Sequence, residues 1–565
     1  MSLLDSCKLL YLRFEGSHNK IRSLLEEQQS RSLEEEFFLI EVLINLKELS
    51  EAQKCINRIQ NNRLSTNECN KIAFYQARVD YAEDRKKEFV ETCETLLHQT
   101  TDHNLKLMIM VDLTLTMRRL GQYICSADRG KAFLSSHPEC EDKCYESQLR
   151  NSIGLNLWNA GRLDEAIHFF ESCKHIYDHY GSRRGLAQVL NNIALILHDK
   201  GTLSEALEKH QQAKILFEES KDNLGAAIAL LNIGAINQKL GHLSNALDEY
   251  KNVDQKAKDL GHKTLEAIAL NNIGNVLRDQ CRYSESLEYL NKALTEFQMI
   301  DNPRFIGMCL ANVGTVFFEQ GKYEDALIYH NQALEIRRKL ENPRDVASTL
   351  LDIIRTKFEA GMNINDEVQS LESEAFTEKV PQAFVSMARA MLNEKNNDYC
   401  KAESCFEKAL TIAGMDFDYK IVCYKALAEL SVGKWLRNKD ITSLEDVHFR
   451  INQYQEICEQ NNLTPYLCQV YLLKAKLHKT LLEVEEARNL LRLCVFLATD
   501  HGLPLHKRLA QKELELTEVM LTELKSLETE PRGTTSPLNI DELQTYFSDI
   551  NKLISNQENY GADDL

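Results

Sequence analysis

Proline, tryptophan and long apolar runs are all scarce in this 565-residue sequence. It holds 8 prolines and 2 tryptophans, while 27% of its residues are charged and 43% are hydrophobic. Because proline breaks helix interiors, this composition favours an almost entirely helical protein. No stretch approaches the ~18 uninterrupted apolar residues of a membrane helix. The first residues, Met1–Phe14, include Asp5 and Lys8, so we expect neither a signal peptide nor a membrane partner.

An excess of basic residues is also missing. Asp and Glu number 85 against 67 Lys and Arg, which leaves a formal net charge of −18. Nucleic acid is therefore not an expected partner, since phosphate binding needs clustered basic side chains. The phosphate loop, His-Glu-x-x-His and Gly-x-Ser-x-Gly motifs are absent as well. We accordingly expect no enzyme activity and no cofactor.

Cysteine, by contrast, is plentiful. The 16 cysteines are scattered, and many occupy apolar positions of expected helices, such as Cys173, Cys309 and Cys494. Buried, reduced thiols of this kind are typical of a cytoplasmic protein.

Two groups of residues resemble metal ligands. One joins His137 and Cys140 to Cys144, and the other places His175 and His179 one helical turn apart. The first spacing matches no common zinc pattern, and the second lacks a nearby third ligand. The sequence therefore favours a turn with a core cysteine, and a solvated helix face, over a metal site.

A 40-residue repeat organises the chain between about residues 143 and 361. Its marker position recurs at Gly161, Gly201, Gly241, Cys281, Gly321 and Gly361. A bulky apolar residue follows each of the first five markers after two residues, and a small residue follows after five. Such self-similarity is typical of a solenoid, in which each unit stacks on the next.

Each unit is expected to form two helices. In the third unit, Leu230, Ile233 and Gly234 lie on one helical face. Gly241 is suited to the left-handed conformation that ends a helix, and a second helix follows it. Gly234 leaves almost no side chain between the paired helices, so their backbones can approach closely. Further along, Asn302-Pro303 and Asn342-Pro343 predict an N-cap followed by a proline at the first helical position.

The repeat resembles the tetratricopeptide repeat (TPR). The residues that carry the resemblance are Leu270-x2-Ile273-Gly274, then Tyr283, then Ser286-x3-Leu290-x2-Ala293. The unit is longer than the usual ~34 residues and lacks the closing proline, so it is most similar to long-repeat members such as Pins-type adaptors and kinesin light chains. HEAT and armadillo repeats share the period but lack the Gly-x-bulky-x2-Ala signature. The resemblance implies an all-α, right-handed superhelix whose concave side is lined by the first helix of each unit.

The composition divides the chain into five segments. They are degenerate helical repeats at 1–142, regular repeats at 143–361, degenerate repeats with a capping helix at 362–528, a flexible linker at 529–538, and a short amphipathic helix with an acidic tail at 539–565. The amphipathic helix, 539–554, is too short to be stable alone, so we expect it to dock either on the solenoid or on a partner.

One asparagine recurs in each of four consecutive units. This asparagine row consists of Asn192, Asn232, Asn272 and Asn312. A side-chain amide both donates and accepts, so such a row can bind the backbone of an extended peptide. An equally good interpretation is that each asparagine ties its repeat to the next one.

Neighbouring positions would add specificity to a peptide site. Those that complete the candidate set are Asn191, Asn271, Asn275, Arg278, Trp158 and Phe318. The two aromatic residues fit packing between repeats better than exposed anchoring. The expected function is a non-catalytic scaffold that binds a peptide or partner protein in its groove. The alternative is a regulator whose superhelix changes when it binds a peptide or a small molecule, and an enzyme is the third hypothesis.

Overall fold

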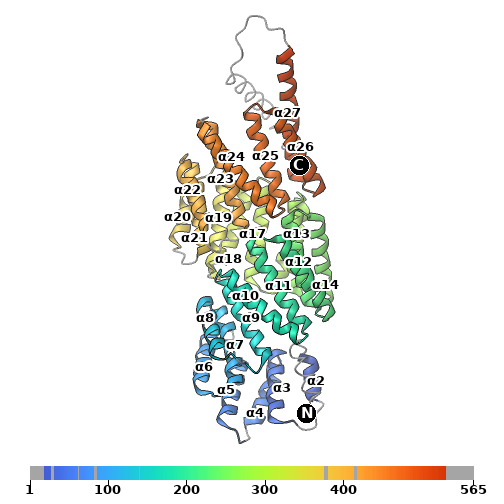
Figure 1. Cartoon of the computed structure of the whole chain (residues 1–565), viewed down its shortest axis with the longest axis vertical. Coiled ribbons are helices and arrows are strands. Elements are labelled where there is room, and N and C mark those ends of the chain that lie inside the picture. Colours follow the sequence, from blue (N-terminus) through green and yellow to red (C-terminus); the bar gives the residue numbers. More distant parts are fainter. Residues whose placement is uncertain are drawn as a thin grey trace. The chain divides into compact units, whose positions relative to one another are not determined.

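Helices make up nearly all of the computed structural model. It describes residues 18–26, 31–60, 63–81, 85–138, 140–340, 342–374, 379–412, 417–438 and 441–529. These residues form 26 helices, α2 to α27, and no strand (Figure 1). None of the helices in these ranges has the length and apolarity needed to cross a bilayer. The expected linker and amphipathic helix beyond Thr529 lie outside the described residues.

The regular block consists of alternating first and second helices. The first helices are α9 (Lys143–Asn159), α11 (Arg183–Lys200), α13 (Asn223–Leu240), α15 (Lys263–Asp279), α17 (Pro303–Glu319) and α19 (Pro343–Glu359). The second helices are α10 (Leu163–His179), α12 (Leu203–Glu219), α14 (Leu243–Asp259), α16 (Tyr283–Met299) and α18 (Tyr323–Lys339). From α11 onward, each first helix begins 40 residues after the one before it, as the sequence predicted.

Helices without the clear repeat signature flank this block. On the N-terminal side are α2 (His18–Glu26), α3 (Leu33–Asn45), α4 (Leu49–Gln60), α5 (Thr66–Asp80), α6 (Lys86–Gln99), α7 (His103–Arg119) and α8 (Tyr123–Ser136). On the C-terminal side are α20 (Asn365–Ser373), α21 (Lys379–Lys395), α22 (Tyr399–Thr411), α23 (Phe417–Asn438), α24 (Ile441–Gln460), α25 (Thr464–Thr480), α26 (Val484–Asp500) and α27 (Pro504–Thr529). The chain divides into two compact units, Met1–Leu230 and Leu231–Leu565, and the division falls inside α13.

Packing between sequence neighbours builds the solenoid. Most helices pack mainly on the helices just before and after them, and some pack at least as closely on the next but one, as α7 does on α9 and α19 does on α21. Glycines allow the close approach within pairs. A Cβ atom at Gly234 would lie 2.7 Å from the ring of Tyr250, and one at Gly274 would lie 2.7 Å from Cγ of Leu290. The prediction of close helix pairing at Gly234 is therefore confirmed.

The turns follow the predicted capping rules. Gly241 has a φ of +85°, and Cys281, which occupies a marker position, adopts the same left-handed region with a φ of 57°. Asn302 caps α17 by accepting a hydrogen bond from the amide of Phe305, and Asn342 caps α19 in the same way. Local sequence alone thus determines where these helices begin and end.

Within the second unit, the C-terminal helices lie beside the early repeats (Figure 1). The rings of His242 and His501 stack with centroids 5.4 Å apart. A Cβ atom at Gly241 would lie 3.0 Å from Cδ of Pro465. One hydrophobic cluster accordingly joins α14 and α15 to α25, α26 and α27. The solenoid of this unit therefore curves until helices separated by more than 200 residues face each other.

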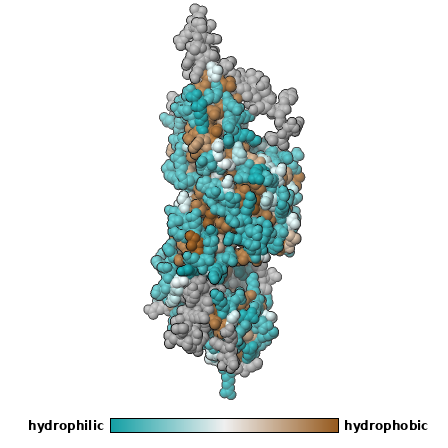
Figure 2. All heavy atoms as spheres, turned by 90° about the vertical axis from the view of Figure 1, so that its right-hand side faces the viewer, coloured by the Kyte–Doolittle hydropathy of each residue, from teal (hydrophilic) through white to brown (hydrophobic). Residues whose placement is uncertain are grey.

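The resemblance of His137, Cys140 and Cys144 to metal ligands has a structural explanation. The ring of His137 stacks on Phe133 with centroids 4.3 Å apart, and Cys144 is buried in α9. Among the described residues, no three His, Cys, Asp or Glu side chains are grouped so that they could hold a metal ion. On the face of the molecule in Figure 2, hydrophilic side chains dominate and hydrophobic ones form separate patches.

Candidate functional site

The asparagine row lies on the first helices, where each of its side chains is half-buried. Two of its members bond to the preceding repeat. Nδ2 of Asn192 donates to Oδ1 of Asn151 at 3.0 Å, and Nδ2 of Asn312 donates to Oδ1 of Asn271 at 2.9 Å. Both bonds span 41 residues. Each therefore ties neighbouring repeats, and each uses one of the two N–H groups of the donating amide.

The asparagines beside the row are less accessible. Asn271 is 1% exposed, and besides accepting from Asn312 it donates to Oδ1 of Asn272 at 3.2 Å. Oδ1 of Asn191 lies 2.9 Å from Nδ1 of His210, a buried ring on the second helix of the same repeat. Oδ1 of Asn275 is buried and accepts no hydrogen bond from a described residue. Asn271 and Asn191 therefore help to hold the helices in place around the row.

A second series of bonds between repeats runs near the end of the first helices. Nε1 of Trp158 donates to Oδ2 of Asp199 at 2.6 Å. Nε2 of Gln238 donates to Oδ2 of Asp279, also at 2.6 Å, and both bonds again span 41 residues. Trp158 thus connects two repeats through its indole N–H, which agrees with a packing role.

Phe318 lies at the same position in α17. Its ring is half-buried and lies 5.9 Å from that of Tyr323, and the guanidinium of Arg355 lies 5.8 Å from its centroid. Phe318 therefore contacts residues of its own repeat and of the next first helix.

A cavity of about 600 Å³ lies within the second unit. One wall comes from α13, α14, α15 and α17, and the opposite wall comes from α23, α25 and α27. The lining residues are Ala235, Gln238, Lys239, Leu243, Tyr250, Asn272, Arg278, Asp279, Cys281, Glu319, Ile421, Leu463, Pro465, Tyr466, Gln469, Leu503, Leu505 and His506. Three first helices thus contribute to the cavity, and two candidate residues, Asn272 and Arg278, meet in it.

An ion-paired arginine lies at the polar side of this cavity. Nη2 of Arg278 donates to Oδ1 of Asp279 at 2.8 Å, and Nε lies 3.3 Å from Oε1 of Glu319 in the next repeat. No described residue accepts a hydrogen bond from Nη1 of Arg278 or from Nδ2 of Asn272. The cavity therefore presents two donor groups that no residue in the described ranges uses.

Burial changes the acidity of the titratable groups around the cavity. The Glu319 side chain is 30% exposed where it lines the cavity, and partial burial raises its pKa to about 7. The charge of Asp279 adds to this increase, whereas that of Arg278 opposes it. On the opposite wall, burial lowers the pKa of His506 to about 4, so its ring is neutral at physiological pH.

The raised pKa of Glu319 predicts a pH-dependent stability. In the folded chain this carboxyl keeps its proton more readily than in the unfolded chain, where its pKa is 4.5. Its contribution to stability is therefore present below pH 4.5 and is lost as the pH rises through about 7. Glu319→Gln should melt near the wild-type temperature at about pH 5 and above it at about pH 8. If the difference in melting temperature between Glu319→Gln and the wild type were the same at both pH values, this prediction would be contradicted.

Sequence reasoning missed the far wall of the cavity. Tyr466, Gln469 and His506 belong to degenerate repeats, where no 40-residue pattern marks an inward position. It also missed the acidic side chains Asp279 and Glu319. Each of them directly follows a position in the 40-residue series that contains Trp158, Gln238, Arg278 and Phe318. That regular spacing was the only signal in the sequence that could have identified them.

Comparison with known families identifies the repeat. A tetratricopeptide repeat model matches residues 185–252 and 265–339. These residues are therefore tetratricopeptide repeats, and the resemblance seen in the sequence is confirmed. No curated protein matches the sequence.

Several solved structures share the helical architecture at low identity. A Rap protein complexed with competence and sporulation factor has a TM-score of 0.44 and 12% identity, over 75% of this chain and 97% of that chain. The apo quorum sensor NprR from B. thuringiensis has a TM-score of 0.41 and 12% identity, over 76% and 98%. A human IFIT1 dimer has a TM-score of 0.40 and 15% identity, over 76% and 95%. These similarities concern the fold alone.

Proposed function

We propose that this chain, a member of the tetratricopeptide-repeat superfamily, is a non-catalytic scaffold that binds a peptide segment of a partner protein on the inner face of its repeats. The observation that carries the proposal is the cavity in the second unit, where two unused donor groups meet an apolar wall. Its volume of about 600 Å³ suits a short segment.

The unused donors indicate which part of a peptide is bound. Nδ2 of Asn272 and Nη1 of Arg278 can donate to carbonyl or carboxylate oxygens, which every peptide carries. The apolar side chains across the cavity, among them Leu463, Leu503 and Leu505, would cover the side chains of the bound segment. Binding would then combine backbone recognition with apolar burial.

We divide three members of the asparagine row by role. Asn192 and Asn312 already donate hydrogen bonds to the preceding repeat, so we assign them to the contacts that hold neighbouring repeats together. Asn272 accepts a hydrogen bond from Asn271 but donates none to a described residue, and it lines the cavity, so we assign it to ligand binding.

Binding measurements on single variants test this assignment. Peptides selected from a random display library on the full chain serve as the probe. Asn272→Ala should weaken their binding by about 0.5–1.5 kcal/mol, or roughly two- to 13-fold, with little change in melting temperature. The matched control Asn192→Ala should lower the melting temperature of the first unit and leave the affinity unchanged. Unchanged affinity in Asn272→Ala would contradict the proposal.

Ligand-gated regulation is the second candidate. It is favoured because the cavity walls come from two parts of the second unit, the early repeats and the helices α23, α25 and α27. An occupant would contact both walls and hold them at one spacing. A selected peptide should then slow hydrogen exchange in α25 and α27 as well as in α15. Protection confined to α15 would contradict ligand gating, and only the scaffold function would still be proposed.

A further inference from the structure

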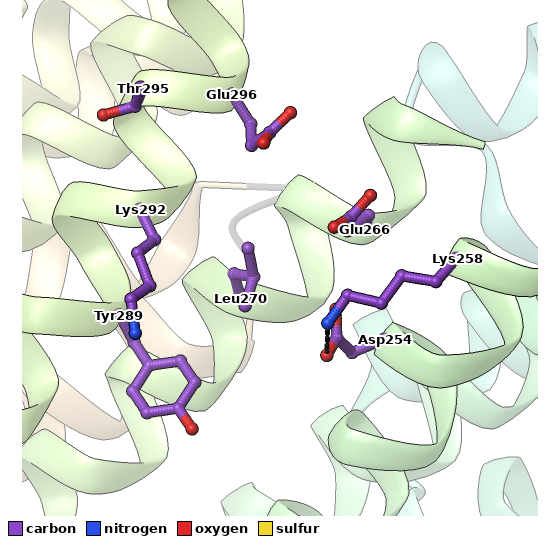
Figure 3. Close-up of a pocket in the computed structure, with 8 residues that line it drawn as sticks. All are labelled: Asp254, Lys258, Glu266, Leu270, Tyr289, Lys292, Thr295 and Glu296. Atoms are coloured by element: carbon purple, nitrogen blue, oxygen red, sulfur yellow. Dashed lines mark hydrogen bonds and ion pairs between the residues drawn. The ribbon is translucent and has the colours of Figure 1, made fainter. Parts of the chain in front are cut away.

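A second hollow lies among the repeats of the second unit, and different side chains line it (Figure 3). It has a volume of about 410 Å³ and lies between the second helices α14 and α16, with residues of the first helix α15 as its floor. The lining residues are Asp254, Lys258, Glu266, Leu270, Tyr289, Lys292, Thr295 and Glu296. We call this hollow the α14–α16 pocket.

The same place in an earlier repeat is occupied by an arginine. Three repeats upstream, Glu146 and Arg150 occupy the positions of Glu266 and Leu270. Oε1 of Glu146 accepts hydrogen bonds from Nε and Nη2 of Arg150 at 2.9 and 2.7 Å. Nη1 of Arg150 donates to Oγ of Ser172 on the second helix at 3.4 Å. The guanidinium thus bridges the buried carboxylate and the neighbouring helix.

Glu266 keeps only part of this arrangement. Its side chain is 9% exposed and accepts a bond from Lys263 at 3.0 Å, as Glu146 does from Lys143 at 2.7 Å. At the next turn, Leu270 supplies no charge. The pocket therefore contains the buried carboxylate without the guanidinium that accompanies it in the earlier repeat.

No other first helix of the regular block shows this combination. The residue pairs at the two positions are Glu146 and Arg150, Leu186 and Leu190, Ala226 and Leu230, Glu266 and Leu270, Ile306 and Leu310, and Val346 and Leu350. Four repeats pair two apolar residues and one pairs an acid with a base. Among these pairs, only Glu266 is a buried acid combined with an apolar residue at the second position.

The remaining charges of the pocket favour a cation. Lys258 donates to Asp254 at 2.6 Å, a bond drawn as a dashed line in Figure 3. Lys292 donates to Glu288, outside the lining, also at 2.6 Å. Glu296 makes no ion pair with another described residue, and Oδ1 of Asp254 is buried without a hydrogen-bond partner among the described residues. The lining thus holds three carboxylates and two lysines, and Lys263, which lies outside the lining, pairs with Glu266.

We propose that the α14–α16 pocket receives the guanidinium of an arginine side chain from a partner protein, bonded to Glu266 and flanked by Glu296 and Asp254. A planar guanidinium can bond two oxygens at once, as Arg150 does from within its own repeat, and it gives up water more readily than an ammonium ion does. This site is separate from the inner cavity, so the proposal does not rest on the proposed function.

Methyl NMR of the full chain tests the proposal at the pocket itself. The methyl group of Thr295, which lines the pocket, is the reporter. Titration with N-acetyl-arginine amide should shift its signal in a saturable manner. N-acetyl-citrulline amide, which has nearly the same shape without the charge, should not shift it.

Two variants complete the test. Glu266→Gln should weaken binding of the arginine amide by about tenfold or more. Leu270→Arg restores the arrangement of the earlier repeat, so it should fill the pocket and abolish the response. Glu296→Gln serves as a second acidic variant if Glu266→Gln lowers the melting temperature. An equal response to citrulline amide, no response to arginine amide in the wild type, or a wild-type response in Leu270→Arg would each overturn the proposal.

Discussion

Asp112→Ala is expected to destabilise the first unit by about 3–5 kcal/mol, because it leaves a buried guanidinium without its counter-ion. Nε of Arg78, in α5, lies 2.9 Å from Oδ2 of Asp112, in α7, and their side chains are 15% and 22% exposed. A second acid, Glu41, is buried in α3. Urea unfolding together with hydrogen exchange in α5 and α7 measures the effect.

An exposed pair is the matched control. Glu335 and Lys339 form a bridge one helical turn apart, and their side chains are 70% and 72% exposed. Solvent screens such a pair, so Glu335→Ala should cost no more than about 0.5 kcal/mol. Because each repeat packs mainly on its neighbours, Asp112→Ala should also leave peptide affinity in the second unit unchanged. A cost below about 1 kcal/mol for Asp112→Ala would contradict the role given to this pair.

Gly185→Ala is expected to cost about 1–3 kcal/mol, although alanine is the better helix former. A Cβ atom at Gly185 would lie 2.3, 2.5 and 2.7 Å from three atoms of the Tyr177 ring. One of these is Cγ, at the base of the ring, so the ring cannot swing aside without moving the helix pair. Thermal melting and hydrogen exchange in α10 and α11 report the loss.

The same substitution at Gly433 should have the opposite sign. Gly433 lies inside α23, and no atom lies within 4 Å of a Cβ built there. Gly433→Ala should therefore stabilise the chain by about 0.5–1 kcal/mol through backbone entropy. If both substitutions stabilised the protein, close packing at Gly185 would not be the reason for its glycine.

Local patterns in the sequence determined the repeat, its period and its helix boundaries. The marker glycines, the spacing of Leu243 and Ala246, and the Asn-Pro caps each depend on residues within a few turns of one another. Such short-range signals are legible in one sequence because helix ends and helix pairing obey local backbone geometry. The expectation that Asn272 and Arg278 lie on an inner face came from the resemblance to tetratricopeptide repeats.

Only the tertiary structure decided what those side chains face. The sequence treats Asn192 and Asn272 alike, yet one donates to the preceding repeat and the other lines a cavity. The difference arises because the opposite wall of that cavity comes from α23, α25 and α27, which follow Asn272 by roughly 150–230 residues. Small rotations between successive repeats add up to this curvature, and no single repeat encodes their sum.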